Sequence, residues 1–214
     1  KEQGWKACAI TDHGNVFGAV KFFQLAKKAG IKPILGVEMY FTPDINIKPG
    51  KGEKKYNHLS VIVKNEAGYK NLCQLLEFAY TKGFYYKPRI DYQRLEEHNE
   101  GLIILSGCMG GHISQLLLSD DNDHVNDRIE WFVKVFGKDR FFIEVMPSYD
   151  EKSEKLQKLL ISKAEQFELE LVATPDSHFL KPCDNDAHEI MLSIGTKALL
   201  TDPNRMTFGD FKGY

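Results

Sequence analysis

Residues 7–41 read ACAITDHGNVFGAVKFFQLAKKAGIKPILGVEMYF, and this stretch predicts a strand, a helix and a second strand. Two short apolar runs, Ala7–Thr11 and Pro33–Phe41, flank the segment Val16–Ala29, whose apolar residues recur at helical spacing. Gly30 follows, as expected for the residue just beyond a helix end. A strand, a crossover helix and a strand form the basic unit of a parallel sheet.

The same alternation continues along the chain. Strands that are apolar throughout and separated by helices are typical of a parallel sheet covered on both faces. The six predicted strands suit either a β/α barrel or an open doubly wound sheet. Asn65 and Asp91 are the expected N-caps of two helices. The further predicted strands are His58–Val63, Leu102–Ser106, Arg140–Met146 and Glu170–Thr174, and the further helices are 65–82, 90–98, 111–119, 122–136, 151–167 and 185–192.

The composition is that of a globular protein without a strong charge bias. Of the 214 residues, 43% are hydrophobic and 27% are charged, and the formal net charge is −2. This balance argues against a polybasic protein, although a local basic patch stays possible. No apolar run reaches the about 20 residues that span a membrane, so we expect no membrane partner. Four scattered cysteines without a C-x-x-C pair indicate reduced thiols and a cytoplasmic protein.

Metal-capable side chains follow the predicted carboxyl ends of strands, where parallel α/β proteins carry their functional residues. The first strand is followed by His13, the second carries Glu38, and the fourth is followed by Cys108. The sixth is followed by Asp176 and His178, which point to the same side of an extended chain and can bind one ion together. Four such ends at one edge of a sheet predict a shared metal site.

Each of these residues also has a purely structural interpretation. Asp176 can cap the next helix, Glu38 can pair with a buried cation, and Cys108 can be a small core residue. For each residue alone, the structural interpretation is sufficient. For all of them together, it requires that metal-capable residues occur by coincidence at four strand ends on one edge of the sheet. Asp12, next to His13, is a candidate to fix the tautomer of that ligand. The fifth strand offers only Glu144 as a candidate.

Two segments are candidates for nucleic-acid contact, although neither a G-x-G-x-x-G nor a Walker A loop is present. The polar loop 43–57 carries lysines that can contact phosphates, and the rings of 84–86 can stack on a single strand. A solvated loop and ring packing are the alternative interpretations. The basic residues concerned are Lys48, Lys51, Lys54 and Lys55 in the loop, and Lys87 and Arg89 after the rings.

Five motifs in this order resemble the polymerase-and-histidinol-phosphatase (PHP) domain, in the version attached to bacterial replicative DNA polymerases. The resemblance covers essentially the whole chain. It implies an α/β fold, a distorted seven-stranded β/α (TIM-like) barrel whose first strand is absent here. It also implies a PHP domain over 1–195, with 196–214 beginning the connection to a polymerase region. The motifs are ITDHGN (10–15), GIKPILGVE (30–38), His58-Leu59, LSGC (105–108) and Asp176-Ser177-His178, with 65–72 and 186–189 also similar.

The resemblance further implies a centre of up to three zinc or manganese ions held by nine residues. His58 enters on the resemblance alone, because it stands at the start of its predicted strand. The remaining three ligands, among them a His-x-His pair, belong before Lys1. The six matching positions are His13, Glu38, His58, Cys108, Asp176 and His178.

Three functions are compatible with these patterns. The resemblance implies metal-dependent phosphodiester hydrolysis, as a proofreading 3′–5′ exonuclease that works with DNA, the rest of the polymerase and other replication subunits at the nucleoid. A second possibility is a non-catalytic module that braces the polymerase and binds a partner subunit. A third is a free-standing phosphatase for a small ester such as histidinol phosphate. Residues 65–72 and 186–189 argue against the third.

Overall fold

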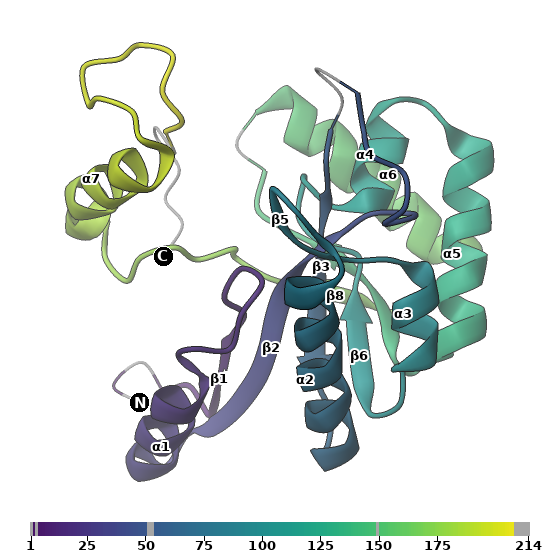
Figure 1. The fold of residues 1–214 in the computed structure, drawn as a ribbon, viewed down its shortest axis with the longest axis horizontal. Coiled ribbons are helices and arrows are strands. Elements are labelled where there is room, and N and C mark those ends of the chain that lie inside the picture. The colour runs from purple at the N-terminus through teal and green to yellow at the C-terminus, as the bar shows by residue number, and fades with distance from the viewer. Residues whose placement is uncertain (1, 3, 51–53, 149, 208–214) are drawn as a thin grey trace.

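A mixed sheet, curled into part of a barrel, organises the molecule (Figure 1). The computed structural model describes residues 2, 4–50, 54–148 and 150–207. The strands run in the order β4-β5-β2-β3-β6-β7-β8, and β1 pairs with the first part of β2. Their bounds are β1 Ala7–Ile10, β2 Lys32–Phe41, β3 Asn57–Val63, β4 Phe84–Tyr85, β5 Lys87–Ile90, β6 Leu102–Leu105, β7 Phe141–Val145 and β8 Leu171–Ala173.

The prediction of a uniformly parallel sheet is wrong for β3, which runs antiparallel to both β2 and β6. The pairs β1–β2, β6–β7 and β7–β8 are parallel, as predicted. The pair β2–β5 is also parallel, but β5 was not among the predicted strands. The reason is the connection: β2 and β3 are joined by the polar loop, without the crossover helix that usually returns a chain to the parallel direction. Because β3 is reversed, its first residues lie where its neighbours end, with His58 opposite Tyr40.

The helices form where the apolar spacing predicts them. Asn65 caps α2 by accepting a hydrogen bond from Gly68 N at 3.0 Å, and Asp91 caps α3 by accepting one from Arg94 N at 3.0 Å. Both predicted caps are confirmed, as is Gly30, which ends α1 at φ 70°. The helices are α1 Ala19–Ala29, α2 Glu66–Thr81, α3 Tyr92–Glu97, α4 His112–Leu118, α5 Asn122–Phe136, α6 Glu151–Phe167 and α7 Asn185–Thr196, preceded by a 3-10 turn at Pro182–Asp184.

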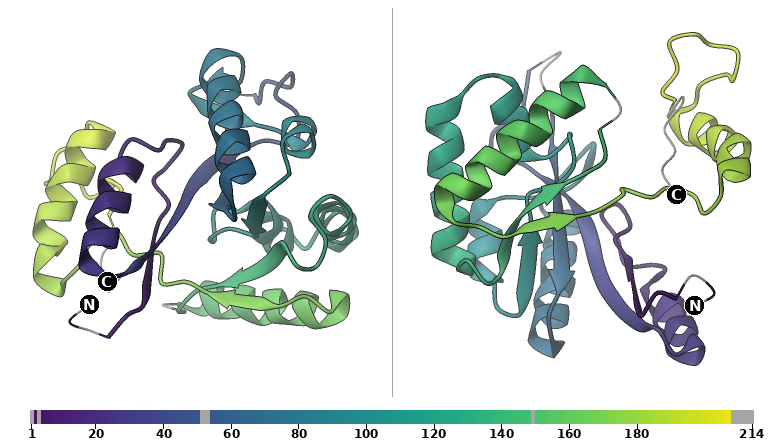
Figure 2. Two further views of the ribbon diagram at one scale, coloured as in Figure 1. Left: turned by 90° about the horizontal axis from the view of Figure 1, so that it is seen from below. Right: turned by 180° about the vertical axis from the view of Figure 1, so that it is seen from behind.

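The core lies between the sheet and the helices α2, α5 and α6, and burial of its apolar side chains is the main favourable term in folding. Phe132 of α5 stacks on Phe141 of β7, with ring centroids 4.8 Å apart. Helix α7 lies apart from the sheet, at the other end of the segment that follows β8 (Figures 1 and 2). None of the helices in the described part of the chain has both the length and the apolar character needed to cross a membrane.

Candidate metal centre

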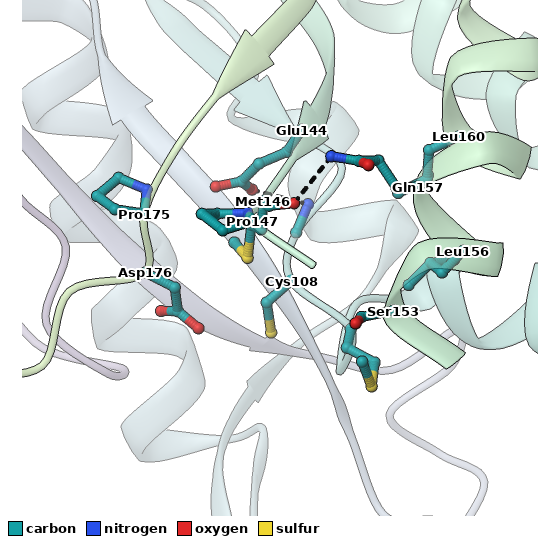
Figure 3. Close-up of a pocket in the computed structure, with 12 residues that line it drawn as sticks. Cys108, Glu144, Met146, Pro147, Ser153, Leu156, Gln157, Leu160, Pro175 and Asp176 are labelled. Carbon is teal, nitrogen blue, oxygen red and sulfur yellow. Dashed lines mark hydrogen bonds between the residues drawn. The ribbon is translucent and has the colours of Figure 1, made fainter. Parts of the chain in front are cut away.

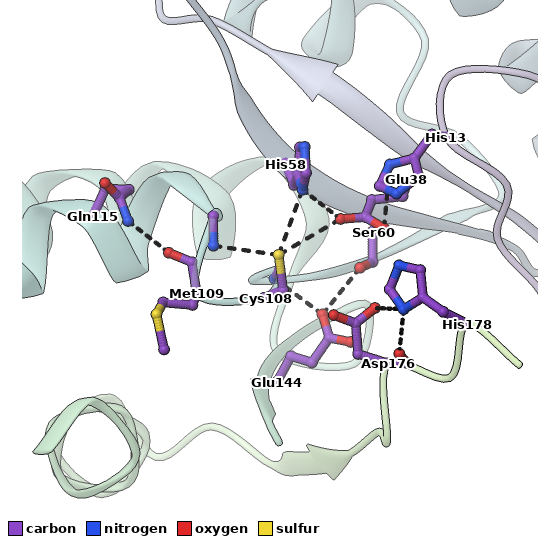
Figure 4. Close-up of polar contacts among 12 residues, drawn as sticks. His13, Glu38, His58, Ser60, Cys108, Met109, Gln115, Glu144, Asp176 and His178 are labelled. Atoms are coloured by element: carbon purple, nitrogen blue, oxygen red, sulfur yellow. Dashed lines mark hydrogen bonds and ion pairs between the residues drawn. The ribbon is translucent and has the colours of Figure 1, made fainter. Parts of the chain in front are cut away.

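One edge of the sheet brings the six predicted ligands into one region (Figure 4). β2, β6 and β8 end at this edge and the reversed strand β3 begins there, so residues far apart in sequence meet. The loop after β1 joins them through an isolated bridge between His13 and Glu38. The ligand candidates are His13 after β1, Glu38 in β2, His58 in β3, Cys108 after β6, and Asp176 and His178 after β8.

Four of these residues form what we term the donor cluster: His13, Glu38, His58 and Cys108. Glu38 Oε1 lies 2.7 Å from His58 Nδ1, and Glu38 Oε2 lies 3.5 Å from His13 Nδ1. The sulfur of Cys108 lies 3.5 Å from His58 Nδ1 and 3.6 Å from Glu38 Oε1. Ligand atoms around a tetrahedral zinc, with bonds of about 2.1 Å, are about 3.4 Å apart. The spacing and chemistry of the donors therefore fit a metal ion.

Glycine backbone conformations hold the His13 side of the cluster. Gly14 N donates to Glu38 O at 3.0 Å, and Gly14 has φ 64°. A Cβ atom on Gly14 would lie 2.8 Å from the ring of Tyr40, so both the conformation and the space call for glycine. The carboxylate of Asp12 lies beside Gly18, just before α1, rather than against the imidazole of His13. Its predicted role beside that ligand therefore has no direct contact to support it among the described residues.

The turn after β6 packs against the start of β3. His58 N donates to Gly110 O at 3.1 Å, and Gly110 N donates to the sulfur of Cys108 at 3.3 Å. Gly107 has φ 89°, and a Cβ there would lie 2.8 Å from the carbonyl oxygen of His58. These contacts fix Cys108 beside His58. Lys54, one of the loop lysines for which phosphate contact and a solvated loop were the alternatives, donates to Gly110 O of the same turn at 3.0 Å.

Asp176 and His178 lie beside the donor cluster. The rings of His178 and His13 have centroids 6.3 Å apart, and His178 Nδ1 lies 2.7 Å from the carbonyl oxygen of Asp176. Asp176 has φ 52°, so the segment is not the extended chain assumed for it from the sequence. Its carboxylate Oδ1 is 4.0 Å from His178 Nδ1. The pair is therefore placed to complete a larger site, next to the four inner donors.

The site concentrates acidic groups in a half-buried setting. Burial raises the pKa of the Cys108 thiol, and the charges of Glu38 and Asp176 raise it further. Burial and the charge of Glu38 likewise raise the pKa of Asp176. Burial also opposes ionisation of Glu38, but the hydrogen bond with His58 and the charge of His13 hold its pKa below the ordinary value. A bound cation would stabilise all three anionic forms, which agrees with the donor spacing.

Glu144 supports the site from behind. This side chain is buried, and its Oε2 accepts hydrogen bonds from Ser60 Oγ at 3.0 Å and Gly107 N at 3.1 Å. Its Oε1 accepts one from Thr174 Oγ1 at 2.7 Å. Burial raises the pKa of Glu144. Because both oxygens are engaged by β3, the turn after β6 and the end of β8, the geometry gives Glu144 a positioning role.

A cavity of about 240 Å³ opens on the Cys108 side of the site (Figure 3). Cys108, Glu144 and Asp176 form its polar wall. The opposite wall is supplied by α6 and by the residues that follow β7, where Gln157 Nε2 donates to Met146 O at 3.1 Å. Its other lining residues are Gly107, Met109, Met146, Pro147, Ser153, Leu156, Leu160 and Pro175. No periodic pattern in the sequence predicts this cavity, because the cavity depends on how α6 packs beyond β7.

Known proteins with similar sequences include a family of domains and polymerase subunits. The family model described as the PHP domain matches residues 1–148. The DNA polymerase III subunit alpha of Deinococcus radiodurans is 41% identical over 207 residues, and that of Thermus aquaticus is 43% identical over 205 residues. Each alignment covers 94% of this chain but only 15% and 17% of those relatives. A solved structure provisionally described as a metal-dependent phosphoesterase, from Bifidobacterium adolescentis, has a TM-score of 0.49 at 14% identity, and covers 83% of this chain and 79% of its own.

Proposed function

Because the chain belongs to the PHP domain family, we propose that it binds metal ions at the donor cluster and hydrolyses phosphodiester bonds there. The observation that carries the proposal is the convergence of two imidazoles and a carboxylate, whose ligand atoms all lie within 4.8 Å of one another. Imidazole and thiolate donors favour zinc over magnesium, and the carboxylate donors also suit manganese. We propose up to three ions in the complete site, with Asp176 and His178 as the outer ligands of this chain.

The chain's own residues have separate tasks in this reaction. When bound, the metal ions supply a water of lowered pKa and neutralise the charge of the phosphate. Lys54 carries its ammonium group beside Gly110, where it can bind a phosphate oxygen that reaches the cluster. Glu144 keeps the Cys108 turn and the end of β8 in place through its three hydrogen bonds. The cavity offers space for one side of the esterified group.

We propose a 3′–5′ exonuclease that removes nucleotides from DNA ends during replication, since the relatives are polymerase subunits. The domain would occupy 1–195, with 196–214 leading to the rest of an alpha subunit in the bacterial cytoplasm, at the nucleoid. DNA and the other holoenzyme subunits would be its partners. The curled sheet would be part of a distorted seven-stranded barrel of the PHP type, with a further strand between β1 and β8 bringing three more ligands.

A second candidate is a non-catalytic module that braces the polymerase and binds a partner subunit. The apolar surface of the α7 region favours it. Ile194 is 67% exposed and Leu199 is 74% exposed, which is more apolar surface than a region without a partner is expected to show. In this second function the donor cluster would bind metal for structure only.

Measurements of metal content and of hydrolysis distinguish the catalytic function from the non-catalytic module. The chain is purified without added metal, and zinc and manganese are counted per chain by mass spectrometry for the wild type, His58→Ala and His178→Ala. His124→Ala is the matched control, because this exposed imidazole contacts Asp121 and lies outside the site. We expect at least one ion per chain, lost in His58→Ala and reduced in His178→Ala, together with stepwise shortening of a 5′-labelled DNA strand as mononucleotides leave its 3′ end.

Less than one ion per chain, unchanged by His58→Ala, would contradict the metal centre and with it the catalytic proposal. Bound metal without any hydrolysis would support the structural module.

A further inference from the structure

Tyr86 stands in an unusual conformation on the surface. It forms the turn between β4 and β5 with φ 63°, in the left-handed region that bulky side chains rarely adopt. It is also 63% exposed, so burial of its ring does not compensate for this conformation. Strained residues of this kind persist where the surrounding structure holds them, and they are concentrated at functional sites.

Basic side chains surround this ring. The ammonium group of Lys55 lies 3.3 Å from the ring centroid of Tyr86, a cation–π contact. The buried Arg89 fixes the polar loop to the hairpin, because its guanidinium donates to Lys55 O at 3.4 Å and Ile45 O at 3.4 Å. Lys48 adds a further charge, with its ammonium 6.0 Å from the ring of Tyr85.

Further rings lead from this hairpin to the donor cluster. The ammonium of Lys87 lies 5.4 Å from the ring centroid of Tyr40. The ring of Tyr40 lies 4.8 Å from that of Tyr56 and 6.0 Å from that of His13, on which it stacks. We term Tyr40, Tyr56, Tyr86, Lys55 and Lys87 the ring-and-lysine tract. It reaches from an exposed turn to the metal-binding histidines.

We propose that the ring-and-lysine tract binds a single strand of nucleic acid and leads its end to the donor cluster, with Tyr86 as an exposed stacking platform for a base. This inference rests on the proposed function and specifies the form of its substrate. Rings interleaved with lysines match a single strand, because each base offers a face for stacking and each phosphate a charge for an ammonium group. An acidic peptide would use the lysines but not the strained ring.

The test measures binding in the absence of divalent metal, so that it is independent of hydrolysis. A labelled oligothymidylate of about 12 nucleotides, within the usual range of site sizes, is titrated with the full chain in EDTA and followed by fluorescence anisotropy. Tyr86→Gly is the decisive variant, because glycine adopts a positive φ without strain. We expect binding weaker by about fivefold or more, since one stacked base contributes at least about that factor to the affinity, together with an unchanged or raised Tm.

The double variant Lys55→Gln, Lys87→Gln tests the charges. We expect the slope of log affinity against log salt to fall by about 1.4, from about 0.7 for each lost phosphate contact. Lys64→Gln, Lys138→Gln is the matched control, because these exposed lysines pair with Asp139 and Glu168 at the opposite edge of the sheet. It should leave the affinity within twofold of the wild type.

Tyr86→Gly with a lower Tm and unchanged affinity would overturn the proposal, because the ring would then be structural. Equal affinity for poly-glutamate and for the oligonucleotide, lost together in the lysine variant, would also overturn it and identify a surface for acidic chains. If the strand binds through the tract but the donor cluster holds no metal, the proposed hydrolysis fails while the tract stands.

Discussion

The buried imidazole of His112 makes the stability of this fold depend on pH. It stands at the start of α4, packed against the rings of Phe41 and Tyr92, with centroids 5.5 Å and 5.9 Å away. Burial lowers the pKa of His112 to about 4, and the positive charges of Arg128 and Lys54 act in the same direction. The folded protein therefore keeps this ring neutral at pH values where the unfolded chain protonates it.

The sign and size of the effect follow from linkage. The folded pKa lies below the ordinary value of 6.5, so the contribution to stability is complete above pH 6.5 and is lost as the pH falls towards 4. The full loss is about 3 kcal/mol, from about 1.36 kcal/mol for each unit between the two values. Between pH 7 and pH 5 the loss is about 2 kcal/mol.

Urea unfolding at pH 7, 6 and 5 measures this for the wild type and for His112→Gln, which cannot titrate. The free energy of unfolding of the wild type should fall by about 2 kcal/mol more than that of the variant between pH 7 and pH 5. His124→Gln, at an exposed position, should follow the wild type. Parallel pH curves for the wild type and His112→Gln would refute the reasoning.

Four other substitutions test the packing, the α2 cap and the buried hydrogen bonds, with urea unfolding as the measurement. Gly68→Ala should lower the free energy of unfolding by about 3 kcal/mol, because its Cβ would lie 1.8 Å from the backbone oxygen of Gly101. The Cβ of Gly195→Ala would meet nothing within 4 Å, so this variant should be more stable by about 0.5 kcal/mol. Similar effects at both sites would contradict this account. Asn65→Ala should cost about 1 kcal/mol through loss of the α2 cap, and a neutral result would show that the cap does not contribute. Glu144→Ala should cost about 3 kcal/mol and reduce metal content, because three donors lose their acceptor; full metal content in this variant would exclude the positioning role.

Much of the fold was predictable because most elements have a local signal. Helix ends can be recognised in the sequence from their capping residues. The structure confirms the N-caps Asn65 and Asp91 and the glycine after α1. The hairpin β4–β5 was not predicted. Its strands have two and four residues, and the second contains Lys87 and the buried Arg89, whose burial depends on carbonyl groups from distant segments.

The residues of the candidate site were predictable on those strands whose direction was also predicted correctly. His13, Glu38 and Cys108 follow from the rule that functional residues stand at carboxyl ends of parallel strands, and the structure brings them together. The same rule does not select His58, because β3 runs antiparallel to β2 and His58 lies at its beginning. The missing helical pattern between Phe41 and Asn57 is the signal that would have identified the reversal. Lys54 was predicted only as one of four loop lysines that can contact phosphates, and its place beside Gly110 had no signal because it depends on the path of the loop.

The reversed strand β3 also has a consequence for how the protein folds. The four donors come from four separate segments between His13 and Cys108, and the pairings of β3 with β2 and with β6 align these segments. Pairings that close long loops are the slow steps of folding. The donor cluster is therefore complete only after the centre of the sheet has assembled. A metal ion that binds at the donor cluster would therefore stabilise the assembled sheet and slow its unfolding, but it would not speed its folding.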